Sequence, residues 1–301
     1  MKKYIPVLAI LLAATLWSLD GFLRQELYSV PAFLIVTIEH TLGALIFIPF
    51  LIHGRKQIFS MNQRTWSSVL WISICGGVLG TFFYTKALSY VQYIDLSVVV
   101  LLQKFQPLFA ISLAAVILKE KITARFIVLA VMAIIGGYFV TFGTSPIADW
   151  DDKTIIAALL ALLAAFSWGS STVLGKHALK HMSYTIVTAL RLTITAVIAM
   201  AVLFSISAPM AIFDLNSSQW LAIIVIVFST GSVALFIYYY GLKHVPASHS
   251  TIYELFWPLS AVAFDWFIRG HMLSFAQIVG TSILLIAIIL LSREPALNQN
   301  A

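Results

Sequence analysis

The sequence predicts an all-α integral membrane protein with ten transmembrane helices, arranged as two inverted repeats of five helices. Three observations lead to this fold class: an apolar composition, ten apolar segments of bilayer-spanning length, and a similarity between the two halves of the chain. Of the 301 residues, 61% are hydrophobic and only 10% are charged, whereas soluble domains carry about 25% charged residues. So few charges cannot cover a water-soluble globule of this length.

Each predicted span is a continuous apolar run, and about 20 such residues are needed to cross the hydrocarbon core as a helix. The first run starts with a basic stretch, as a signal peptide does, but no clear cleavage site follows, so we expect an uncleaved first helix. The ten spans lie at residues 5–23, 31–52, 67–88, 94–117, 124–143, 154–174, 184–205, 220–240, 247–267 and 273–291.

The distribution of basic residues predicts the orientation. With the N-terminus in the cytoplasm, twelve Lys and Arg residues fall on the cytoplasmic side and three fall outside, which is the positive-inside pattern. We therefore expect a protein of the cell (inner) membrane with both termini in the cytoplasm. The net charge of +6 follows from these loops and forms no basic stripe for nucleic acid. Cys75 is the single cysteine, which excludes an intrachain disulfide framework.

The two halves are related by an offset of 151 residues. AATLWSLDG (13–21) aligns with AAFSWGSST (164–172), which places Trp17 on Trp168. The same offset places His40 on Arg191 and Pro107 on Pro258, while the third span of each half fits better at 154. Because five spans is an odd number, the second half must enter the membrane the opposite way round. We divide the chain into residues 1–145 and 146–301.

Together with this repeat, the tryptophan pattern of spans one and six and the stretch QPLFAISLAAVILKEKIT (106–123) resemble the EamA-type transporters of the drug/metabolite transporter superfamily. The resemblance covers about residues 5–291 and implies ten helices around a central cavity. It also implies a carrier of small molecules, since members export amino acids and other metabolites or carry quaternary amines such as choline. One departure is clear: IRGHMLS (268–274) stands where the first half has LKEKITA (118–124).

Charges inside spans cost roughly 2.5–3.5 kcal/mol each on insertion scales, so each needs a partner or a purpose. Asp20 and Asp265 each precede an arginine by four residues, which favours a local pair at the headgroup level. Asp95 suits a helix N-cap, and Lys86 can extend to the surface. Four others have no opposite charge three or four residues away: Glu39, Lys104, Arg191 and Glu254. They predict either two interhelical salt bridges or a polar cavity.

Prolines and aromatic residues complete the candidate site. A proline inside a helix leaves the carbonyl four residues earlier without its partner, so Pro107 frees that of Gln103 and Pro258 frees that of Glu254. We expect kinks there, as in the interrupted helices of carriers. A tryptophan beside a carboxylate suits an ammonium group, although lipid- or core-facing aromatics are the alternative. The aromatic candidates are Trp17, Trp71, Tyr84, Trp168, Tyr238 and Trp257.

These features predict a secondary transporter with alternating access for an amino-acid-like zwitterion, working as an exporter with protons as a candidate coupling ion. Choline-like cations are the alternative substrate. Two alternatives belong to functional classes other than transport. One is an intramembrane hydrolase that uses Ser170 or Ser171 with His177, and the other is a membrane scaffold. We expect no metal, no cofactor, and a monomer or homodimer. The predicted substrate-binding residues are Trp17, Glu39, Gln103, Lys104, Trp168, Arg191, Tyr238, Glu254 and Trp257.

Overall fold

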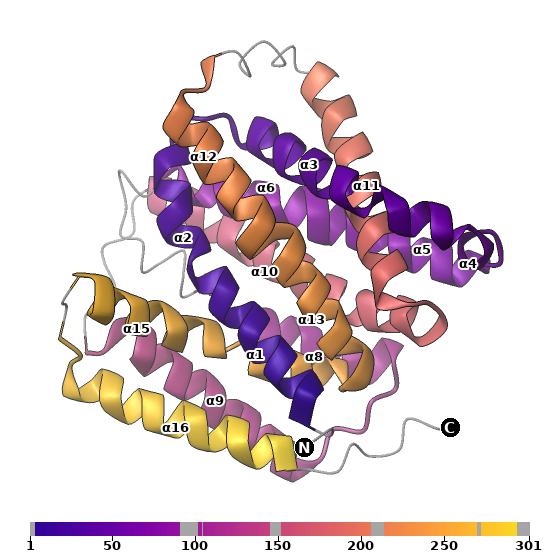
Figure 1. Ribbon diagram of the computed structural model, residues 1–301. Coiled ribbons are helices and arrows are strands. Elements are labelled where there is room, and N and C mark those ends of the chain that lie inside the picture. Colours follow the sequence, from indigo (N-terminus) through magenta and orange to yellow (C-terminus); the bar gives the residue numbers. More distant parts are fainter. Residues whose placement is uncertain are drawn as a thin grey trace.

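The computed structural model describes residues 4–90, 102–103, 105–144, 152–205, 214–269 and 272–293. These residues form helices joined by short turns, with no strand among them (Figure 1). The all-helical fold class is therefore confirmed.

The helices of the first half are α1 (Ile5–Ser18), α2 (Asp20–Leu23), the 3-10 turn η2 (Arg24–Leu27), α3 (Ala32–His53), α4 (Arg55–Phe59), α5 (Gln63–Trp71), the π-helical η3 (Ile72–Leu79), α6 (Gly80–Leu88), α8 (Gln106–Ile117) and α9 (Ala124–Phe142). Those of the second half are α10 (Asp152–His181), α11 (Tyr184–Ser205), α12 (Ser217–Ile226), the π-helical η5 (Val227–Gly231), α13 (Ser232–His244), α14 (Ala247–Tyr253), α15 (Phe256–Arg269) and α16 (Phe275–Arg293).

Eight helical segments within the described residues are long and apolar enough to cross a membrane. They match eight of the ten predicted spans. The fourth and ninth predicted spans are broken: the fourth is described mainly by α8, and the ninth is split into α14 and α15. The break follows from the prolines, since Pro107 is the second residue of α8 and Pro258 the third of α15. Proline is tolerated in the first turn of a helix, where its missing N–H has no partner to lose.

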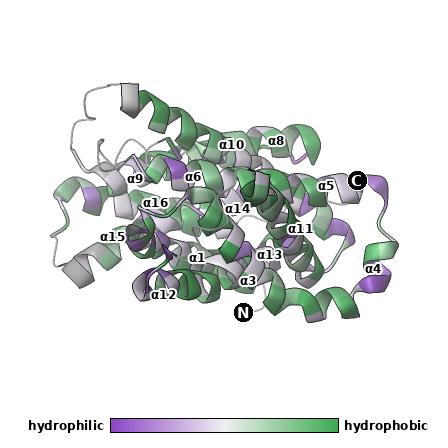
Figure 2. Cartoon of the chain, turned by 90° about the horizontal axis from the view of Figure 1, so that it is seen from above, coloured by the Kyte–Doolittle hydropathy of each residue, from purple (hydrophilic) through white to green (hydrophobic). Residues whose placement is uncertain are grey.

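The surface of the bundle suits a lipid environment. Large apolar side chains are exposed along the outer helices, among them Leu8 of α1, Val116 of α8 and Phe204 of α11. Figure 2 shows hydrophobic residues along most helices and hydrophilic residues gathered at α4 and at helix ends. In lipid this arrangement costs little, because the hydrocarbon tails are as apolar as these side chains. The backbone polar groups are satisfied inside each helix.

Helix packing follows the internal repeat. The helix pairs in contact include α1 with α13, α10 with α6, α3 with α11, α8 with α14, and α9 with α16. In the repeat, α1 is equivalent to α10 and α6 to α13, so the α1–α13 contact is equivalent to the α10–α6 contact. Each of the other three pairs joins two equivalent spans, one from each half. Local structure repeats as well: Asn62 and Asn216, 154 residues apart, both N-cap the third helical span of their half, and both spans contain a π-helical stretch.

Helices α9 and α16 approach closely through two glycines. A Cβ atom added at Gly136 would lie 2.8 Å from the Leu284 nitrogen and 2.9 Å from the Gly280 carbonyl oxygen. Both are backbone atoms, which cannot move without shifting a helix. Small residues at such crossings let the helix backbones approach within van der Waals distance. Gly137, one residue on, has only a Leu255 methyl group within 4.0 Å of the same position.

We therefore expect Gly136→Ala to destabilise the protein by about 1–3 kcal/mol through overpacking. Gly137→Ala is the matched control, and it should be neutral or slightly stabilising because alanine is the better helix former. Thermal unfolding of both variants in detergent checks this expectation. Equal melting temperatures for the two variants would contradict the close α9–α16 contact.

Candidate functional site

A central cavity of about 210 Å³ lies between the two halves of the chain. Helices α1, α3, α6 and α8 of the first half line it together with α10, α11, α13 and the α14–α15 break of the second. Eight of the nine predicted site residues line it: Trp17, Glu39, Gln103, Trp168, Arg191, Tyr238, Glu254 and Trp257. Lys104 and Asp95, and the side chain of Asp265, lie outside the described residues.

An acid–base cluster forms one end of the cavity wall. Arg24 Nε lies 2.5 Å from Asp20 Oδ2, and Arg24 Nη2 lies 3.0 Å from Glu39 Oε2. Thr230 Oγ1 donates a 2.7 Å hydrogen bond to Asp20 Oδ1. The local pair of Asp20 and Arg24 is confirmed, and the structure adds Glu39 of α3 as a second partner of Arg24. Arg24 is only 6% exposed, because the chain bends after α1 and carries the pair over α3, where Glu39 lies.

Arg24 lines a second cavity as well as the central one. This second cavity has a volume of about 230 Å³ and is lined by residues of η2, the start of α3 and the end of α6. Thr85 is one of them and accepts a 3.5 Å hydrogen bond from Arg24 Nη1. Arg24 thus contributes to the walls of two cavities.

Arg191 lines the cavity without a carboxylate partner among the described residues. Its Nη1 donates a 2.8 Å hydrogen bond to the Tyr239 hydroxyl, and its guanidinium carbon lies 5.6 Å from the centre of that ring. Its Nε has no hydrogen-bond partner in the part of the chain that the structure describes. Among the described residues, neither of the two salt bridges expected between Glu39, Lys104, Arg191 and Glu254 forms, because Glu39 pairs with Arg24 instead. Arg191 remains a buried cation held by an aromatic ring.

Glu254 lies at the break between α14 and α15 and joins three other helices. Its Oε1 accepts a 2.6 Å hydrogen bond from Tyr238, and its Oε2 accepts one of 2.7 Å from Gln106 Nε2. Tyr238 in turn bonds Thr172 of α10 at 3.0 Å. The expected free carbonyl of Glu254 is wrong, because this oxygen accepts the N–H of Trp257 at 3.0 Å. A tighter turn thus satisfies the group that Pro258 leaves unpaired.

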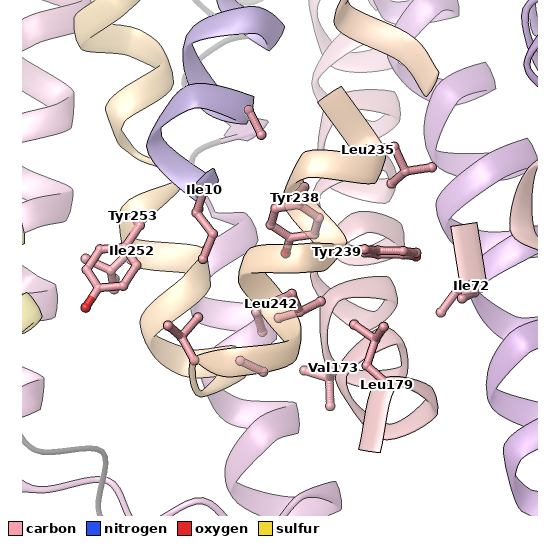
Figure 3. Close-up of a cluster of buried hydrophobic side chains, with 14 of the residues drawn as sticks. Ile10, Ile72, Val173, Leu179, Leu235, Tyr238, Tyr239, Leu242, Ile252 and Tyr253 are labelled. Atoms are coloured by element: carbon pink, nitrogen blue, oxygen red, sulfur yellow. The ribbon is translucent and has the colours of Figure 1, made fainter. Parts of the chain in front are cut away.

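Two equivalent aromatic pairs line the cavity. Trp17 packs on Tyr238 with ring centroids 5.1 Å apart at 55°, and Trp168 packs on Tyr84 at 5.3 Å and 56°. The repeat offsets carry one pair onto the other, and each pair joins the two halves. Trp168 Nε1 also donates to the Gly76 carbonyl of η3 at 3.1 Å. Figure 3 shows Tyr238 on α13 beside Tyr239, between the buried side chains of Leu235 and Leu242.

Other sequence candidates lie elsewhere. Trp71 is 41% exposed, is absent from the cavity lining, and donates to Ser170 Oγ at 3.0 Å. His177 bonds Ser68 at 2.8 Å rather than Ser170 or Ser171, so the hydrolase pair expected as an alternative does not form. No group of three or more potential metal-binding side chains occurs within the described ranges.

Other lining residues are not among the predicted substrate-binding residues, namely Asp20, Arg24, Gln106, Ser171, Tyr239 and Thr251. Ser171 was expected only as a nucleophile of the alternative hydrolase. Asp20 and Arg24 were set aside because their spacing explained them locally. Gln106 and Tyr239 adjoin Pro107 and Tyr238, and this adjacency was the available signal. Ser171 and Thr251 are small polar residues of the kind common in membrane helices, and no pattern distinguishes them.

Comparison with known proteins agrees with this architecture. The chain matches the EamA-like transporter family twice, over residues 4–142 and 155–293. It is 35% identical over 291 residues to the riboflavin transporter ImpX of Fusobacterium nucleatum, covering 95% of this chain and 97% of that protein. It is 22% identical over 276 residues to the uncharacterized transporter YoaV of Bacillus subtilis, covering 91% and 92%.

A solved crystal structure has the same fold, with a TM-score of 0.73 at 18% identity and coverage of 96% of this chain and 97% of that one. The two family matches span nearly all of the helices described above, and the relatives are aligned along almost their whole length. The chain therefore belongs to the EamA-like transporter family and is a multi-pass membrane transporter.

Proposed function

We propose that the protein is an alternating-access carrier of riboflavin or of a flavin with the same ring system. The observation that carries the proposal is the pair of equivalent Trp–Tyr contacts in one cavity, Trp17 with Tyr238 and Trp168 with Tyr84. The transporter ImpX, 35% identical along the chain, is named for riboflavin. A planar heteroaromatic ring is the substrate class that such walls suit, because offset stacking and edge contacts add to the burial of its apolar faces.

Polar atoms without internal partners support the same substrate class. Within the described part of the chain, five residues of the lining contain a buried polar side-chain atom with no hydrogen bond: Glu39 Oε1, Gln103 Oε1, Ser171 Oγ, Arg191 Nε and Thr251 Oγ1. A buried unpaired polar atom costs about 1–3 kcal/mol, so a bound solute that bonds them gains affinity. The set mixes donors with acceptors. A flavin offers the same mixture, with imide and carbonyl groups on its ring edge and hydroxyls on its side chain.

The charges of the cavity also suit a neutral solute. Arg24 is paired with both Asp20 and Glu39, so its guanidinium group requires no anionic group from the substrate. Glu254 accepts hydrogen bonds from Tyr238 and Gln106, and both of its oxygens are therefore occupied. This occupation disfavours a choline-like ammonium group at Glu254.

An amino-acid-like zwitterion is the second candidate. It is favoured by one observation: Glu39 Oε1 and Arg191 Nε are unpartnered groups of opposite charge in the lining of the same cavity. An ammonium and a carboxylate of one solute would match them. For either substrate, we place the protein in the cell membrane with the start of α1 and the end of α16 on the cytoplasmic side. The count of twelve basic residues inside against three outside supports this orientation.

In proteoliposomes containing the purified chain, we expect saturable transport of radiolabelled riboflavin that excess unlabelled riboflavin abolishes. Excess amino acids or choline should not compete. Liposomes without protein and uptake of each labelled competitor provide the controls, and loading flavin inside or outside measures both directions. Saturable amino-acid transport without riboflavin transport would replace the first candidate with the second.

We further expect Trp17→Ala and Trp168→Ala each to weaken riboflavin binding about 3- to 10-fold, since an aromatic contact contributes about 0.5–1.5 kcal/mol beyond burial. Trp168→Phe should lose more affinity than Trp17→Phe, because only Trp168 has an indole hydrogen bond to Gly76. Titration monitored by flavin fluorescence measures the affinities. Trp220→Ala is the matched control, because Trp220 packs in another cluster outside the lining. Unchanged binding in both alanine variants would place the flavin elsewhere.

A further inference from the structure

We infer that Glu120 is a positioning residue of the transport cycle. It fastens the start of α14 to the loop that follows α8, and so keeps the central cavity closed at the end of the protein where α1 begins. The inference rests on the alternating-access part of the proposed function. It concerns a residue outside the cavity lining, in a loop of the first half.

Glu120 makes three hydrogen bonds across the two halves. Its Oε1 accepts the N–H of Ala247 at 2.8 Å, and its Oε2 accepts the N–H of Ser248 at 3.0 Å and the Ser248 hydroxyl at 2.5 Å. The turn that presents the carboxylate contains Lys119 at a φ of 54°, and the Glu120 N–H bonds the Ala114 carbonyl at 3.2 Å. Hydrogen bonds to an ionised acceptor are about twice as strong as neutral ones.

Two lysines tie the same end together. Lys176 of α10 donates to the carbonyls of Leu242 and Lys243 at the end of α13, at 3.0 and 2.9 Å. Lys243 of α13 donates to the Met182 carbonyl at the end of α10, at 2.8 Å. Each lysine thus satisfies terminal carbonyls of the other helix, where a cation is favoured by the helix dipole. With Glu120, these bonds join α10, α13, α14 and the loop after α8.

The lining of the central cavity ends at Thr172, Tyr239 and Thr251, about one helical turn before these contacts. Lys176, Leu242 and Ala247 are all less than 5% exposed. At the opposite end, Arg24 also lines a second cavity. The start of α14 is also coupled to the site, since Thr251 and Glu254, one and two turns beyond Ser248, line the central cavity. Opening the cavity toward the start of α1 requires α14 to leave the loop, and this breaks the bonds of Glu120.

The sequence does not repeat the carboxylate of Glu120 in the second half. The offset of 151 residues places Glu120 on His271, in the stretch IRGHMLS, which has no carboxylate. His271 itself lies outside the described residues. An inverted repeat with equivalent contacts in both halves would make its two closed states similar in energy. Glu120 therefore favours the state closed at the start of α1.

One-sided thiol labelling tests this inference without any substrate. A Cys75→Ser, Thr251→Cys chain in oriented proteoliposomes is treated with a membrane-impermeant maleimide from the side on which α1 begins. We expect Glu120→Ala to raise the labelling rate at position 251 by about tenfold or more, from the loss of the charge-assisted bonds. Glu120→Asp, which retains the carboxylate, should restore most of the protection.

Glu26→Ala is the matched control. Glu26 is exposed and accepts a 2.9 Å hydrogen bond from Ser218 at the opposite end, so its loss should leave the labelling slow. Labelling of Glu120→Ala at the parent rate would overturn the inference. So would an equal gain at the buried Cys75 in a chain that retains it, because this indicates general loosening. No flavin is added in this experiment, so its result does not depend on whether the protein transports riboflavin.

Discussion

Water cannot solvate a charge in the middle of a bilayer, so the structure depends on how its buried charges find partners within the protein. Arg24 does so with Asp20 and Glu39, both within 3.0 Å. The bond to Asp20 fixes the short helix α2 after the bend at the end of α1. The bond to Glu39 fastens this bend to α3, and Thr230 attaches it to η5 of the second half. One cluster therefore sets the geometry of a wall that belongs to two cavities.

The repeat supplies the symmetric part of the site. Trp17 with Tyr238 and Trp168 with Tyr84 have nearly the same ring geometry. Each pair takes one residue from each half, so neither half can form an aromatic wall alone. Sites at the interface of inverted repeats allow a carrier to expose the same walls to either side by rocking one repeat against the other. On the proposed alternating-access cycle, the aromatic residues are the part of the cavity that would serve both states.

Residues that occur in one half only make the two ends different. Arg24 aligns with Gly175 and Glu120 with His271, so neither the acid–base cluster nor the carboxylate bonded to Ser248 has an equivalent in the other half. The residues that line the cavity and the residues that hold the helix ends together are thus different residues in different places. A substrate changes the balance between states only through its unequal affinity for them, and the contacts at the helix ends set the balance from which it starts.

The sequence by itself determined the class of the protein, eight of its spans, and the halves from which the cavity is built, because these follow from hydropathy and a fixed repeat offset. It also placed eight candidate residues in one lining, since charges, prolines and tryptophans are expensive or distinctive in apolar helices. Only the tertiary structure decided the partners. Glu39 lies 15 residues from Arg24, and Glu120 lies more than 120 residues from Ser248. Spacing along a helix reports neighbours three or four residues away, whereas bonds between helices depend on how the bundle packs.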